Sequence, residues 1–210
     1  MEVRRIDREG EDLLPALRLV TGAGRLGDEK QVRGILQAVE EGRSSIDLLY
    51  GVYEQGRLCG AVLALESPGR AALLMLPPRL EPGVETTLAT AVGLLRREAW
   101  SRGLLLLQAL TEPGSVSHAA VLQRSGFQYV TRLIYLRASL VTPFPEPRCA
   151  EGLTWVDYRP EREELFRRAL SLSYVQSLDC PELTGIRSVA DTLAAHRASG
   201  VFTPEGWWVA

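Results

Sequence analysis

The chain has 210 residues, of which 46% are hydrophobic and 24% charged, and its 24 basic side chains nearly balance 26 acidic ones. This composition excludes a disordered chain, no apolar run approaches the roughly 20 residues that span a bilayer, and a net charge of −2 gives no basic field for nucleic acid. Three cysteines without a CxxC pair, and an N-terminus without an apolar signal segment, predict a reduced, cytoplasmic protein with no metal site.

The spacing of apolar residues predicts a single α/β domain at the start of the chain. In order, we expect a strand, two helices, a β-hairpin, a third strand, a long helix, a strand buried on both faces, a short helix and a closing strand. These elements are predicted at residues 2–6, 13–20, 28–42, 48–54 with 57–66, 71–76, 85–102, 104–110, 116–125 and 127–136.

Turn and capping residues set the boundaries of these elements. Asp28 with Gln31 forms a capping-box pattern at the start of the second helix, and Gln55-Gly56 is placed as the hairpin turn. Pro77-Pro78 must end the third strand, because neither residue can donate a hydrogen bond to a ladder.

Prolines mark a linker near the middle of the chain. Pro143, Pro145 and Pro147 fall within residues 141–152, which are predicted to be extended. Beyond them the patterns predict a strand, two helices and a strand, the order that opens the chain. These are expected at residues 153–158, 160–175, 188–199 and 206–210. We therefore predict domains at 1–140 and 153–210, the second being the first half of another copy of the same fold.

Three segments carry a resemblance to a known family. They are GVYEQGRLCG at 51–60, LLMLPP at 73–78 and VLQRSGF at 121–127. Together with the element order, they resemble the GNAT N-acetyltransferase superfamily over roughly residues 1–140. The resemblance implies an α/β (α+β) fold with a mixed sheet flanked by helices.

The resemblance also implies where acetyl-CoA would lie. In this family it occupies a cleft where two parallel strands part, its pantetheine arm bonds free backbone groups of the first strand, and its pyrophosphate sits on N–H groups at the start of the following helix. The residues that this implies are Leu74, Met75, Leu76, Arg79, Gly83, Val84 and Ser115.

Several positions depart from the family pattern. Pro82 removes an N–H from the phosphate loop, and Glu81 with Glu85 outnumbers Arg79 there. Where the family often has a catalytic tyrosine the chain has Leu122, and where it often has an asparagine the chain has Ser115. No catalytic residue is assigned.

Other candidate groups have simpler structural interpretations. Glu66 and Glu112 lie beside turns, where a solvated role is favoured, and Cys59 lies on an apolar strand as a core residue. His118 could relay a proton, but a partly exposed histidine in a first helical turn is the more ordinary role.

The segment SLDCPELTGIR at 177–187 resembles the start of the C-terminal unit in two-domain bacterial GNAT proteins. The resemblance places Asp179, Cys180 and Arg187 in the acceptor pocket. A turn that caps a helix is an equally open interpretation, with Pro181 and Gly185 as turn formers and Ser188 as the N-cap.

Three hypotheses for function follow. The first is an acetyl-CoA-dependent N-acetyltransferase that acts on a small-molecule amine. The second is a non-catalytic GNAT-like domain that supports a catalytic unit beyond residue 210. The third is an interaction module built on Trp207-Trp208, whose exposed strand edge would form a homodimer.

Overall fold

The computed structural model describes residues 1–23, 29–139, 141, 152–178 and 180–210. They form two compact units, the first made of residues 1–128 with 185–200, and the second of 129–184 with 201–210. Residues 185–200, which the sequence analysis assigns to the second domain, thus belong to the first unit. Asp28 and nearly all of the predicted linker lie outside the described residues.

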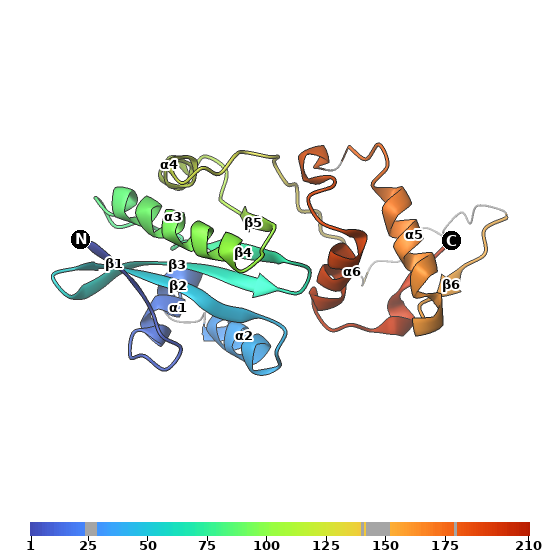
Figure 1. The fold of residues 1–210 in the computed structure, drawn as a ribbon, viewed down its shortest axis with the longest axis horizontal. Helices are drawn as coiled ribbons and strands as arrows, with labels where there is room; N and C mark the ends of the chain where they lie inside the picture. The colour runs from blue at the N-terminus through green and yellow to red at the C-terminus, as the bar shows by residue number, and fades with distance from the viewer. Residues whose placement is uncertain (24–28, 140, 142–151, 179) are drawn as a thin grey trace. The chain divides into compact units, whose positions relative to one another are not determined.

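A mixed sheet forms the centre of the first unit (Figure 1). Within the described residues its strands lie in chain order and pair antiparallel, except that the last two run parallel. They are β1 (Glu2–Arg5), β2 (Ser45–Glu54), β3 (Arg57–Ser67), β4 (Ala71–Met75) and β5 (Leu106–Ala109). The predicted fold class, a mixed sheet flanked by helices, is confirmed.

The predicted hairpin is confirmed by its turn geometry. Gln55 and Gly56 join β2 to β3 with φ of 50° and 80°. Positive φ at both central residues is the type I′ arrangement, whose twist matches that of the flanking strands.

Helices cover both faces of this sheet (Figure 1). They are α1 (Leu13–Thr21) and α2 (Glu29–Glu40) on one face, and α3 (Glu85–Ser101) on the other, with α4 (Val116–Arg124) packed against α3. Strand periodicity divides the core accordingly: Leu48 belongs to the cluster under α3, and Leu49 to the cluster under α1. The long apolar β2–β3 hairpin therefore supports two hydrophobic layers.

Two sequence predictions about the end of the first unit are wrong. Residues 127–136 form no strand, and β5 is not buried on both faces, since Leu106 and Leu107 are half-buried and Gln108 is exposed. Both errors concern the outer edge of β5. The N–H of Phe127 donates to the carbonyl of Leu122 at the end of α4, residues 127–136 form no strand beyond it, and no described strand covers this edge of β5.

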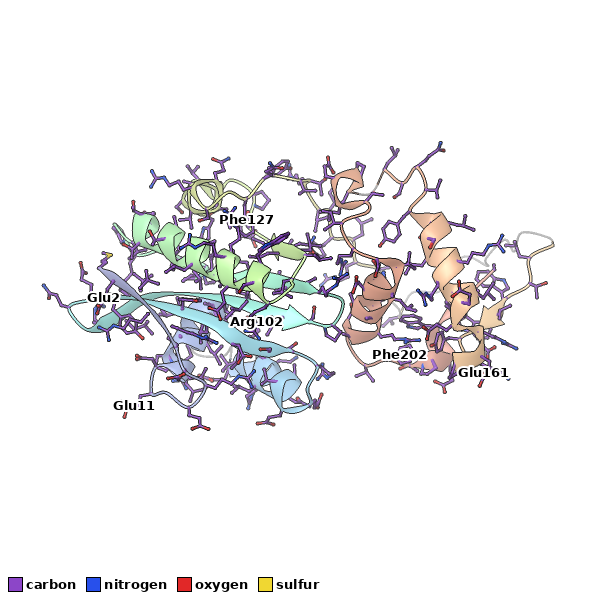
Figure 2. All side chains as sticks on the ribbon, viewed as in Figure 1. Glu2, Glu11, Arg102, Phe127, Glu161 and Phe202 are labelled. Atoms are coloured by element: carbon purple, nitrogen blue, oxygen red, sulfur yellow. The ribbon has the colours of Figure 1, made fainter. Side chains whose placement is uncertain are left out.

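The second unit contains a two-stranded sheet and an aromatic core. Strand β6 (Val156–Asp157) pairs antiparallel with β7 (Trp208–Val209), and α5 (Glu163–Ser173) follows a 3₁₀ turn. Four rings pack mostly edge to face, among them Phe202, which Figure 2 labels. The cluster consists of Tyr158, Phe166, Phe202 and Trp207. Trp207 is thus part of a core rather than of an exposed edge.

Helix α6 (Val189–Ala198) begins at the predicted N-cap. Ser188 accepts a hydrogen bond from the backbone N–H of Asp191, and the Asp191 carboxylate accepts one from the N–H of Ser188. This reciprocal capping box confirms the structural role that the sequence analysis left open for Ser188. Within the described part of the chain, no helix is both long and apolar enough to cross a membrane.

Candidate functional site

The parallel strands β4 and β5 stop pairing at a definite point. Their ladder runs from Ala71 opposite Leu106 to Leu74 opposite Ala109, and neither strand continues in it. Strand β4 ends at Met75, immediately before the region of Pro77 and Pro78. The proline pair therefore ends the strand as predicted, and backbone groups beyond Leu74 are not engaged with β5.

The imidazole of His118 reaches the β4 side of this region from α4. Its Nε2 lies 2.7 Å from the carbonyl oxygen of Pro77, and its Nδ1 lies 2.5 Å from the hydroxyl of Ser115. Because a carbonyl can only accept, Nε2 carries a proton and donates it; in the neutral ring Nδ1 then accepts from the Ser115 hydroxyl. With 9% of its surface exposed, His118 is a buried link between α4 and the end of β4.

The first turns of α3 and α4 line one open groove. It has a volume of about 690 Å³. Its walls are Glu85, Thr86, Gly114, Ser115, Val116, Ser117, Ala120 and Arg124. Both helices therefore present their positive dipole ends to the same space.

Backbone donors at the start of α3 are free to bind a ligand. The N–H of Val84 donates to Glu81 and that of Leu88 to Val84, whereas those of residues 85–87 have no partner within the described residues. Arg124 adds a cation, since its Nη1 lies 3.3 Å from the Thr86 hydroxyl. These groups make the α3 end of the groove suited to an anion.

Charge in the preceding loop is more balanced than the sequence indicates. The guanidinium of Arg57 forms an ion pair with Glu81 at 3.3 Å, so this carboxylate is partly neutralised. Glu85 lines the groove itself, and its carboxylate opposes anion binding there.

The predicted cofactor residues fall into three groups. Leu74 and Val84 are buried in the core, whereas Ser115 lines the groove. The others lie outside the groove's lining: Met75 and Leu76 are half-buried at the end of β4, Arg79 is exposed, and Gly83 is exposed with φ of +84°. Sequence reasoning missed Thr86 and Arg124 as groove residues. Spacing could have found Arg124, because Ser117, Ala120 and Arg124 share one face of α4.

The structure describes two of the three predicted acceptor residues, and these two belong to different units. Asp179 lies outside the described residues, and Cys180 belongs to the second unit. Arg187 belongs to the first unit, where its Nη1 donates to the carbonyl of Gly69 at 3.2 Å. Gly69 lies in the β3–β4 turn, at the opposite end of β4 from the groove.

Three residues that the sequence analysis considered for catalysis have structural roles instead. Burial raises the pKa of the Cys59 thiol, which donates to the carbonyl of Val52, so the thiol stays protonated. Leu122 is packed in the core. Burial likewise raises the pKa of Glu66, which forms an ion pair with Arg102 at 3.1 Å near the end of α3 that is remote from the groove. Within the described residues, no group of His, Cys, Asp and Glu side chains could hold a metal ion.

Comparison with known proteins gives structural likenesses only. No family model matches the chain, and no curated protein matches it. Among solved structures, the chain is similar to a probable acetyltransferase, with 15% identity, a TM-score of 0.49, and coverage of 66% of this chain and 99% of the other.

Two further structures are aminoglycoside-related acetyltransferases. One is AAC(6')-Iy with a bisubstrate analogue, CoA-S-monomethyl-acetylneamine, at 16% identity and TM-score 0.46, covering 66% of this chain and 97% of that one. The other is the aminoglycoside antibiotic 6'-N-acetyltransferase from Acinetobacter haemolyticus, at 15% identity and TM-score 0.46, covering 67% and 99%. Likenesses at this level assign no function to the chain.

Proposed function

We propose that this chain is a GNAT-type protein that takes part in acetyl transfer from acetyl-CoA to a small-molecule amine. One observation carries the proposal. The first turns of α3 and α4 converge on a single groove, on elements that directly follow the two parallel strands whose pairing stops. The order and direction of the elements from β1 to α4 are those that the resemblance to GNAT acetyltransferases implies.

The groove offers what the phosphates of CoA need. Free N–H groups at residues 85–87, the dipole of the 17-residue helix α3 and the Arg124 guanidinium would hold the pyrophosphate. The ion pair between Arg57 and Glu81 lowers the repulsion from the preceding loop. Acetyl-CoA itself supplies the acetyl group as a thioester, and the amine would attack its carbonyl directly.

The acyl end fits less well. A pantetheine arm would need free backbone groups beyond Leu74 on β4. Pro77 and Pro78 have no N–H to offer, and the Pro77 carbonyl already accepts from His118. The proposal therefore has more support at the phosphate end, where Glu85 is the opposing group, than at the acyl end.

A second candidate function is favoured by Leu122. The position where the family often places its catalytic acid is occupied by a buried apolar side chain, 9% exposed, that cannot donate a proton. In that case the first unit is a non-catalytic GNAT-like domain that supports a catalytic unit elsewhere.

The second unit bears on the same alternative. From residue 153 onward the chain repeats the order strand, helix, helix, strand. These elements are β6, α5, α6 and β7, of which α6 belongs to the first unit. The outer strands of this series pair antiparallel, as β1 and β2 do. We propose that residues 153–210 begin a second GNAT-like domain.

Binding and turnover separate the two candidates. For an acetyltransferase, acetyl-CoA raises the melting temperature of the chain, and thiol release is detected when amines are added. For a supporting domain, no thiol release occurs with any amine. A melting temperature that does not change at millimolar acetyl-CoA would contradict the proposal that this chain binds it.

A further inference from the structure

We infer that residues 185–200 are held on the first unit by a polar clasp that opens as the salt concentration rises, and that its opening loosens the start of β5. The clasp consists of Gly69 and Arg70 in the β3–β4 turn, and of Arg187 and Asp191 around the start of α6. The inference goes beyond the proposed function, because it involves neither the groove nor acetyl-CoA.

Residues 185–200 belong to the first unit, whereas the segments on either side of them do not. The second unit runs to Thr184 and resumes at Val201. The intervening segment contains α6, and a helix of ten residues is only marginally stable by itself in water. The stability of α6 therefore depends on the contacts that the segment makes.

Two sets of hydrogen bonds join this segment to the β3–β4 turn. Arg70 donates to both oxygens of the Asp191 carboxylate, from Nε to Oδ1 at 3.0 Å and from Nη2 to Oδ2 at 2.7 Å. In the other direction, Nη1 of Arg187 donates to the carbonyl of Gly69 at 3.2 Å. A bidentate pair fixes orientation as well as distance, so the turn and the start of α6 are held in one arrangement.

Gly69 allows the turn to lie directly against the backbone of α6. A methyl group at this position would overlap the carbonyl oxygen of Asp191 and lie 3.0 Å from the Cβ of Ala195. A backbone carbonyl cannot turn aside as the end of a flexible side chain can. Any side chain at residue 69 would therefore push α6 away from the turn.

The backbone of Arg70 is strained at this contact. Its φ is +55°, in the left-handed region that is uncommon for residues other than glycine, asparagine and aspartate. Strain of this kind persists where surrounding contacts impose it. The ion pair with Asp191 is such a contact, and it explains why an arginine occupies a turn position that suits a glycine or an asparagine.

The described contacts of the clasp are polar rather than apolar. Among the described residues, none of 185–200 belongs to either apolar cluster of the first unit. The ion pair lies at the surface, where the Arg70 side chain is 52% exposed. Salt screens such a pair, so the clasp should weaken as the ionic strength rises.

Arg70 also connects the clasp to β5. Its carbonyl oxygen accepts hydrogen bonds from the N–H groups of Leu105, at 2.9 Å, and of Leu106, at 3.3 Å. These bonds lie where the parallel ladder begins, with Ala71 opposite Leu106. When Asp191 releases the guanidinium, the backbone of Arg70 can relax, and the two bonds to β5 loosen with it.

Hydrogen exchange of the full chain, resolved by NMR, tests the clasp. When KCl is raised from about 0.05 M to about 0.5 M, exchange in α6 is expected to become about threefold faster. The N–H groups of Leu105 and Leu106 should follow in the same direction with a smaller change. Exchange in the β2–β3 hairpin should stay the same, which separates opening of the clasp from general unfolding.

Gly69→Ala and Gly56→Ala form a matched pair of variants. Both glycines lie in hairpin turns of one sheet, with φ of +89° and +80°, but a methyl group at Gly56 would have nothing within 4 Å. We expect Gly69→Ala to speed exchange in α6 about tenfold and to remove its dependence on salt. Gly56→Ala has the same kind of backbone strain and should leave exchange in α6 unchanged.

Arg70→Asn is the second test, in case Gly69→Ala does not fold. Asparagine tolerates the left-handed conformation but lacks the guanidinium, so the turn should form while exchange in α6 rises about threefold and no longer depends on salt. Exchange in α6 that is independent of salt in the unmodified chain, or that rises equally in Gly69→Ala and Gly56→Ala, overturns the clasp. Faster exchange in α6 without any change at Leu105 and Leu106 overturns its connection to β5.

Discussion

The two ends of helix α3 differ in whether their polar groups have bonding partners. At its amino end, the N–H groups of residues 85–87 lack partners within the described residues, and Glu85 and Thr86 line a groove. At its carboxyl end, polar and charged side chains from α3, β1, β2, β3 and the adjoining turns bind one another in two groups, which together are called the ionic network here. One group is Arg5, Tyr50 and Glu98, and the other is Arg8, Asp47, Glu66 and Arg102.

Arg102, labelled in Figure 2, joins Asp47 and Glu66. Its Nη2 lies 3.0 Å from Asp47 and its Nη1 lies 3.1 Å from Glu66. Burial, and then the hydrogen bond to Glu98, raises the pKa of Tyr50 to about 12, so this hydroxyl remains a donor. The carboxyl end is thus held by ion pairs among side chains, whereas the amino end has backbone donors without a partner within the described residues.

The largest effect is expected from Arg102→Ala. The variant leaves Asp47 without one of its two cations and half-buried Glu66 without its ion pair, so we expect a loss of about 2 kcal/mol in the free energy of unfolding. Urea unfolding measures this loss. Acetyl-CoA affinity per folded molecule should not change, because the groove is at the other end of α3.

Arg97→Ala is the matched control for this comparison. Arg97 is an exposed residue of α3, and its replacement removes the same charge as Arg102→Ala. We expect the free energy of unfolding to change by no more than about 0.5 kcal/mol. Equal destabilisation by the two variants would show that net charge, and not the network, accounts for the effect.

Local signals in the sequence were sufficient for most of the fold. Apolar periodicity predicted α3 and α4 within two residues of their observed bounds, and the Gln55-Gly56 pair predicted the hairpin turn. The closing strand at 127–136 failed because β-propensity says nothing about whether a partner edge is in reach. Residues such as Tyr135 and Leu136 are 83% and 92% exposed.

Less of the candidate site than of the fold could be predicted from the sequence. A count of charges in the phosphate loop could not show that Glu81 is paired with Arg57, which is 24 residues earlier. His118 was treated as a residue of one short helix, because its contact with Pro77 spans 41 residues. Long-range pairing of this kind depends on the assembled sheet, which local patterns do not encode.

A smaller effect, confined to the ligand, is expected at the amino end of α3. Arg124→Ala removes the cation beside Thr86, and we expect acetyl-CoA to bind about tenfold more weakly, or about 1.4 kcal/mol. The melting temperature without ligand should stay the same, because this exposed side chain makes one long hydrogen bond. Calorimetry measures the affinity at low and high salt, and the difference from the unmodified chain should shrink as salt rises.

Arg97→Ala again serves as the control. It changes the net charge by the same amount as Arg124→Ala, but at a position far from the groove. A similar loss of affinity in both variants would mean that Arg124 acts through the overall field of the protein. The two ends of α3 would then not differ in the way described above.

The smallest expected effect is a change in the pH dependence of stability through Glu66. Burial raises the pKa of Glu66 above its unfolded value near 4.5, so the folded state binds a proton first and gains stability as the pH falls from neutrality toward that value. Asp47 acts in the opposite sense at lower pH. Burial opposes its ionisation, but hydrogen bonds from Arg102, Ser45 and Arg8 together lower its pKa below 3.8, so its contribution is lost in acid.

Replacement of Glu66 by glutamine separates these two contributions. Between pH 7 and about 4.5, the unfolding free energy of the unmodified chain should rise relative to that of Glu66→Gln, because the variant has no proton to take up. Asp47→Asn should instead flatten the loss of stability below about pH 4. Urea unfolding at a series of pH values measures both differences. Parallel curves for Glu66→Gln and the unmodified chain would mean that Glu66 titrates as an ordinary solvated carboxyl, and that the ion pair with Arg102 fully compensates its burial.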